Sequence, residues 1–215
     1  MSAGRALRKA LRGMWEQSWR LFLANLALSL GVLPFVVAAL WAPLALVVAV
    51  LVAGPLSMAL MHCAVELARE DELSLRCWPA GVRLHWRRGL ALAAGCGLTF
   101  AAGVTAIGAY GGAGRAALAA VVLYLLLVFG VYQLALWPLA VVERTRPLRA
   151  VARAAARVVL RSPLAATILA LALLVVNAVG VAAALLPLLT LTLAYSSLAA
   201  AHFTLSRNPF TEPQG

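Results

Sequence analysis

The chain has 215 residues, of which 64% are hydrophobic and only 12% are charged, and its formal net charge is +11 at pH 7. Soluble domains are close to half apolar and a quarter charged, and a chain of this size has too little interior to hide so much apolar surface. The composition therefore excludes an ordinary water-soluble globular protein and favours helices that are surrounded by lipid.

Apolar segments of the length of a membrane-spanning helix, about 20 residues, recur along the chain. The first two are divided at 41-WAP-43, where Trp41 suits a membrane interface and Pro43 suits the first turn of a new helix. The third and fourth are divided by a glycine-rich turn, and the fifth and sixth by Pro187. We expect six spans, at about residues 20–41, 43–67, 89–110, 116–142, 163–186 and 188–205.

The segments between and beyond these spans are polar or basic. Two charged connections, 69–88 and 143–162, follow the second and the fourth span. The sequence thus predicts an all-α, polytopic membrane bundle of six transmembrane helices in three outward hairpins, with short amphipathic helices on the cytoplasmic side. Its expected parts are a basic cytoplasmic N-terminal segment (1–19), a six-helix transmembrane domain (20–205) and a flexible cytoplasmic tail (206–215).

The basic residues predict the orientation. Six spans place every Lys and Arg residue on one side of the membrane except Arg115, out of 18 in the chain. Because cytoplasmic loops are enriched in Lys and Arg, both termini are expected to be cytoplasmic. The net charge is then a consequence of topology, and nucleic acid is not an expected partner. The strong preference for Arg over Lys is typical of a GC-rich bacterial genome, so we expect the bacterial cytoplasmic (inner) membrane.

A stripe of four arginines crosses the second charged connection. They are spaced four residues apart, which places them on one slowly drifting face of a helix. Such a helix lies at the cytoplasmic interface, where its basic side chains contact lipid headgroups or dock a partner protein. The stripe consists of Arg149, Arg153, Arg157 and Arg161.

One pair of ionisable residues falls within a predicted span. His62 and Glu66 lie four residues apart on the second span and face the same direction. Because ionisable groups in a bilayer are costly, the pair is a candidate for handling protons or cations. The alternative is a structural contact within a turn of the interface. Cys63 is adjacent to His62, but neighbouring side chains on a helix diverge, so no metal site is expected.

Several neutral polar residues lie deeper in the spans. If their side chains converge, they line a polar cavity. Otherwise they form hydrogen bonds between helices. The cavity candidates are Asn25, Ser57, Gln133 and Asn177. The chain has no phosphate-binding glycine loop and no hydrolase or metalloprotease motif, so we expect neither an enzyme nor a cofactor. Its three cysteines are expected to be free thiols.

Three local features resemble the YesL-like family of small bacterial multi-span membrane proteins. They are an Asn near the start of the first span in 22-FLANLAL-28, the segment 54-GPLSMA-59, and the basic aromatic run 76-RCWPAGVRLHWRR-88. The resemblance implies a membrane protein without established chemistry, of a kind sometimes associated with carbohydrate uptake.

Two functions compete at this point. The first is a non-enzymatic accessory or partner of a solute transport system, which fits the lack of catalytic groups and the basic cytoplasmic face. The alternative is a small transporter or substrate-binding membrane subunit with a polar cavity between its helices. The expected partners are membrane lipids and transporter subunits, with a second copy of the chain as a further candidate.

Overall fold

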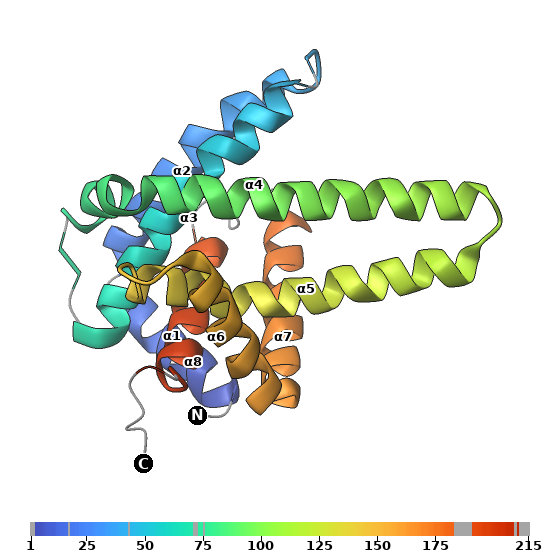
Figure 1. Ribbon diagram of the computed structural model, residues 1–215. Helices are drawn as coiled ribbons and strands as arrows, with labels where there is room; N and C mark the ends of the chain where they lie inside the picture. The colour runs from blue at the N-terminus through green and yellow to red at the C-terminus, as the bar shows by residue number, and fades with distance from the viewer. Residues whose placement is uncertain are drawn as a thin grey trace.

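The computed structural model describes residues 3–16, 18–42, 44–70, 73–74, 76–182, 191–208 and 210. Every regular element in these ranges is a helix, which confirms the all-α prediction. Figure 1 labels them in chain order. The helices are α1 (Ala3–Glu16), α2 (Ser18–Ala38), α3 (Leu44–Glu70), α4 (Cys77–Gly112), α5 (Ala116–Val142), α6 (Leu148–Arg161), α7 (Pro163–Ala182) and α8 (Leu193–Leu205).

Five of these helices are long and apolar enough to cross a membrane: α2, α3, α4, α5 and α7. They coincide with the first five predicted spans, and they make the chain compatible with a multi-pass membrane protein. The predicted sixth span begins at 188, but residues 183–190 lie outside the described residues. Its described part is α8, a helix of 13 residues, so a sixth span stays a prediction.

The third span differs from its prediction in where its helix begins. The sequence predicts a polar connection up to residue 88, but α4 starts at Cys77 and continues for 36 residues. At 1.5 Å per residue this helix is about 54 Å long, well beyond the roughly 30 Å of a hydrocarbon core. Charge excludes a segment from lipid but not from a helix, because Arg and Leu have similar helix propensities. The basic run therefore forms the first turns of α4.

The short helix α8 lies in the compact part of the molecule and packs against α1, α3 and α5. Its Ala199, Ala200 and Ala201 are buried, and small side chains let helix backbones approach closely. Thr204 Oγ1 donates a hydrogen bond to the Leu134 carbonyl of α5 at 3.2 Å. Tyr195 donates one to the Leu7 carbonyl of α1 at 3.3 Å, so α8 is joined to both neighbours.

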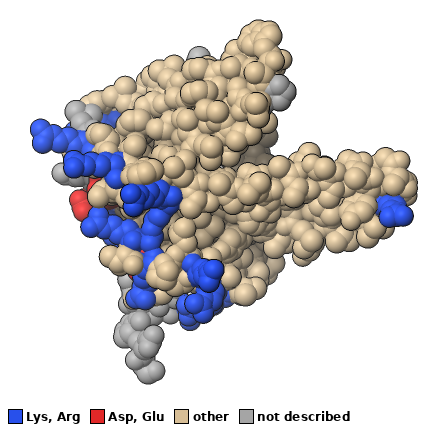
Figure 2. Space-filling model, turned by 45° about the horizontal axis from the view of Figure 1, so that its top comes forward, with Lys and Arg blue, Asp and Glu red and all other residues tan. Residues whose placement is uncertain are grey.

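Two antiparallel helix pairs extend from this compact part. The turn at 39–42 follows α2 and leads towards α3, and the turn at 113–115 connects α4 to α5. Figure 1 shows the α2–α3 pair pointing upward and the α4–α5 pair reaching to the right. In the space-filling view the two pairs separate, with an open notch between them (Figure 2). Near the base of this notch, a Cβ on Gly97 of α4 would lie 2.9 Å from Val50 Cγ1 of α3.

The basic residues lie at the base from which the two pairs extend. Figure 2 shows Lys and Arg gathered there, with one further basic patch at the tip of the α4–α5 pair. That tip holds Arg115, which precedes the first turn of α5. The Lys and Arg residues are therefore distributed as the predicted spans imply. They form a charged base, and the rest of the molecule is almost uncharged.

Candidate functional site

The site is built where the end of α3 meets the start of α4. The two helices approach so closely at Gly54 and Gly89 that a Cβ on Gly54 would lie 2.4 Å from the Gly89 carbonyl oxygen. A Cβ on Gly81 would similarly lie 2.9 Å from Ala59 Cα and 3.1 Å from His62 Cβ. Glycine is required at such contacts because any side chain would collide with the opposite helix. This packing places the first turns of α4 directly against His62.

His62 and Glu66 form the first part of the site. His62 Nε2 lies 3.1 Å from Glu66 Oε1, so the i, i+4 pair faces one direction along α3. The His62 side chain is 14% exposed and that of Glu66 is 34% exposed. The pair is thus embedded on one side and reachable from the surface on the other. The contact is compatible with either interpretation of the pair, and it leaves the carboxylate able to accept a further ligand.

Cys77 is the residue that sequence reasoning missed. It begins α4, and its Sγ, an imidazole nitrogen of His62 and a Glu66 carboxylate oxygen all lie within 4.8 Å of one another. Cys77 is buried, and the Cys63 thiol of α3 is its neighbour. Among the described residues, those close to His62 and Glu66 in sequence do not supply a third ligand. The missing ligand comes from the next helix, and the only sequence signal was the small residue Gly81 one turn later in 76-RCWPAGVRLHWRR-88.

His85 closes the inner side of the site. Its ring lies 5.2 Å from that of His62, centroid to centroid, with an angle of 53° between the planes. His85 is buried, and within the described part of the chain its Nδ1 has no hydrogen-bond partner. A buried polar atom without a partner is uncommon and raises the free energy of the folded state. The site is therefore polar on its inner wall as well as at its mouth.

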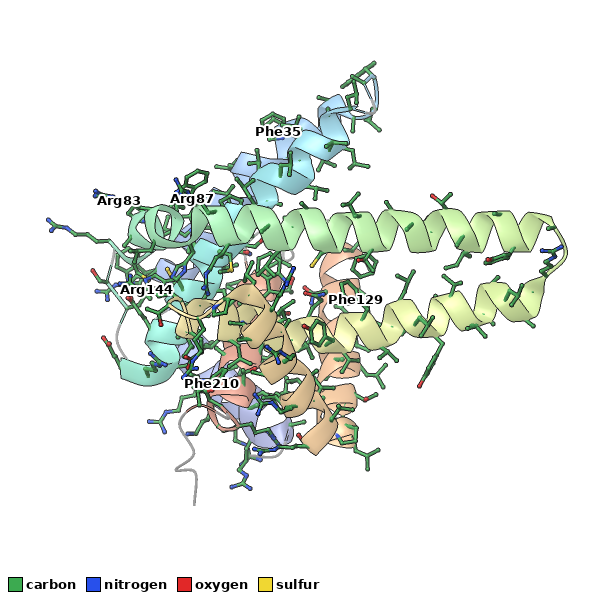
Figure 3. The ribbon with its side chains drawn as sticks, viewed as in Figure 1. Phe35, Arg83, Arg87, Phe129, Arg144 and Phe210 are labelled. Carbon is green, nitrogen blue, oxygen red and sulfur yellow. The ribbon has the colours of Figure 1, made fainter. Side chains whose placement is uncertain are left out.

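Several arginines lie at the same end of the molecule as the site. Arg144, at the end of α5, lies close enough to interact electrostatically with both imidazoles. Figure 3 shows it at the same end of the molecule as Arg83 and Arg87, which project from the first turns of α4. A bare cation would be repelled here, so any cation at the site needs anionic ligands.

Arg88 fastens α4 to the end of α5. Its guanidinium donates hydrogen bonds to the carbonyls of Ala140 and Glu143, both at 3.0 Å, and to that of Arg146. The last carbonyls of a helix lack partners within the helix and carry partial negative charge, so a cation is favourable there. Arg146 in turn forms an ion pair with Glu143 at 3.2 Å. The charged base is therefore ordered by specific contacts.

The arginine stripe lies on the outer face of α6. All four residues are exposed, whereas Val151, Ala154, Ala155 and Val158 are buried beneath them. The helix is amphipathic with its apolar face on the bundle, so its arginines project towards the surroundings. This is the arrangement expected for headgroup or partner contact. The exposed residues are Arg149, Arg153, Arg157 and Arg161.

The four cavity candidates lie on four different helices. Gln133 Oε1 of α5 accepts hydrogen bonds from Trp137 Nε1 at 3.0 Å and from Cys96 Sγ of α4 at 3.3 Å. Asn177 Nδ2 of α7 donates to Ser196 Oγ of α8 at 2.9 Å and to a backbone carbonyl of its own helix. These contacts join helices, α4 to α5 and α7 to α8. Asn25 is buried in α2, and Ser57 is half-buried in α3.

No family model, curated protein or solved structure matches this chain. The resemblance to the YesL-like family therefore stays a prediction.

Proposed function

We propose that this chain is a non-enzymatic integral protein of the bacterial inner membrane that serves as an accessory or partner of a solute transport system. The family resemblance suggests carbohydrate uptake as the class of transport. In this proposal the hairpins lie in the bilayer, the termini and the charged base face the cytoplasm, and a transporter subunit packs against the hairpins.

The observation that carries the proposal is the open notch between the α2–α3 and α4–α5 pairs (Figure 2). Val104 lies seven residues after Gly97 and so on the same face of α4, and it is exposed. Val47 lies three residues before Val50 on α3 and is exposed as well. Two apolar walls that diverge from a common base offer a surface for further transmembrane helices. Without a hydrophobic driving force in lipid, such helices associate by close packing.

The polar contacts favour this role over the alternative of a small transporter. A transporter of this kind needs polar side chains that line one path or cavity. Gln133 and Asn177 instead use their hydrogen bonds to join neighbouring helices. Hydrogen bonds between transmembrane helices contribute modestly, at about 0.6 kcal/mol each, and have a structural purpose.

Photo-cross-linking in native membranes tests the proposal. A photoreactive amino acid at Val104, in the notch, should yield a covalent adduct with a transporter membrane subunit, identified by mass spectrometry. The matched control carries the same group at Leu160, which is exposed on α6 outside the notch and should not yield that adduct. Adducts only with a second copy of the chain, or only with lipid, would contradict the accessory role.

A further inference from the structure

We propose that His62, Glu66 and Cys77 bind a divalent transition-metal ion of the zinc class at the charged base of the molecule. The three residues come from the end of α3 and the first residue of α4. Each offers one ligand atom, and these atoms lie within 4.8 Å of one another. The site is independent of the function proposed above, because it requires no partner protein.

The geometry is close to that of a tetrahedral site. Zinc lies about 2.0–2.3 Å from nitrogen, oxygen and sulfur ligands, which places tetrahedral ligand atoms roughly 3.4–3.7 Å apart. His62 Nε2 and Glu66 Oε1 are already 3.1 Å apart. The Cys77 thiol lies within 4.8 Å of the other two ligand atoms, so it has to approach them by at most about 1.4 Å. Three protein ligands leave a fourth position for water.

The donor set selects the class of metal. An imidazole nitrogen, a carboxylate oxygen and a thiolate sulfur together suit zinc and its neighbours, whereas magnesium and calcium prefer oxygen ligands alone. A bound ion takes the proton from the Cys77 thiol. The thiolate and the Glu66 carboxylate then supply two negative charges, which balance a divalent ion in spite of the nearby Arg144.

The surroundings of the three ligands also fit a metal site. The mouth is open at Glu66, whose side chain is the most exposed of the three, so an ion can enter from the aqueous side. The inner wall is His85, whose buried Nδ1 has no partner within the described residues. Metal-binding histidines are commonly oriented by neighbouring polar groups, and the adjoining imidazole can hold an ordered water beside the site. The Cys63 thiol lies beside that of Cys77, but Cys63 is not among the three residues whose ligand atoms all lie within 4.8 Å of one another, so it is not among the ligands.

Metal binding would join α3 to α4 across the connection between them. Because the ion would be bound by residues 62, 66 and 77, it would hold the end of α3 and the start of α4 together. The ion thus stabilises the same base that carries Arg83, Arg87 and Arg88.

Cobalt titration of the full chain tests the site. The protein is purified in mild detergent with its thiols reduced, and Co²⁺ is followed by the absorption of tetrahedral cobalt and of the thiolate-to-cobalt transition. We expect one ion per chain, displaced by one equivalent of Zn²⁺. Cys77→Ser should abolish the thiolate band, and His62→Gln and Glu66→Gln should weaken binding by at least about 100-fold, since even residues beyond the ligands change metal affinity by 10–100-fold.

Cys96→Ser is the matched control. It removes a thiol from the same helix, at a position that bonds Gln133 instead of the site, and should leave the cobalt spectrum and stoichiometry unchanged. The elution profile and thermal midpoint of each metal-free variant show that it is folded. Wild-type protein that binds no more cobalt than Cys77→Ser, or an equal loss in Cys96→Ser, would overturn the proposal.

Discussion

Gly89→Ala should strongly destabilise the fold, although it adds only one methyl group. A Cβ at this position would lie 2.7 Å from the Gly54 carbonyl oxygen and 2.7 Å from the Pro55 nitrogen. Both are backbone atoms of α3, so neither can rotate away, and α4 has to move from α3 along the contact that positions the site. Overpacking of this kind costs about 3 kcal/mol, even after a gain of up to about 1 kcal/mol in helix propensity.

Two other glycines provide graded controls for this substitution. A Cβ on Gly31 would lie 2.6 Å from Leu56 Cδ1, the end of a flexible side chain, so Gly31→Ala should cost less than Gly89→Ala. Gly95 lies on the same helix as Gly89, and a Cβ there meets nothing within 4 Å. Gly95→Ala should therefore be neutral or stabilising. The measurement is the fraction of monodisperse protein that survives heating in detergent, and equal losses in Gly89→Ala and Gly95→Ala would contradict the packing.

Leu169→Ala should destabilise the protein by about 2–3 kcal/mol, and Leu171→Ala should have almost no effect. Both lie on α7, but Leu169 is 0% exposed and Leu171 is 56% exposed. In lipid an exposed leucine gains little from burial, because the surrounding chains are equally apolar. The loss at Leu169 is therefore the cavity left in the packing, which places it near the lower end of the 2–5 kcal/mol found for core leucines in soluble proteins.

The thermal midpoints of the two leucine variants in the same detergent measure this difference. The shift should be several degrees for Leu169→Ala and within error for Leu171→Ala. Similar shifts for both would mean that α7 is not packed through the face that contains Leu169.

Hydropathy predicted the long apolar helices well because length and composition determine them. The second and fourth spans begin and end within about three residues of α3 and α5. The start of α4 was wrong by more than three turns, because the charges of Arg83, Arg87 and Arg88 were interpreted as the mark of a connection. Charge indicates where a segment meets water, but a basic run can stay helical because Arg has a high helix propensity. The register between α3 and α4 depends on Gly54 and Gly89, whose pairing no local pattern reveals.

The candidate site was predictable only in part. The spacing of His62 and Glu66 places both on one helix face, and the structure joins them at 3.1 Å. Cys77 and His85 reach the pair through the contact of α4 with α3, which is tertiary information. For the polar residues of the predicted spans, the sequence indicates the helix face but not the hydrogen-bond partner. In the structure, Gln133 and Asn177 form hydrogen bonds between neighbouring helices.

The orientation of the charged base is the central claim, and cysteine labelling tests it most directly. Ala113→Cys lies in the exposed turn between α4 and α5, and Arg153→Cys lies on the exposed face of α6. The native cysteines are buried or half-buried, and the unaltered chain measures their background labelling. A maleimide that cannot cross membranes should label Ala113→Cys in intact spheroplasts, and Arg153→Cys only after the membrane is opened. Labelling of Arg153→Cys from outside, or of both positions alike, would contradict a basic face in the cytoplasm.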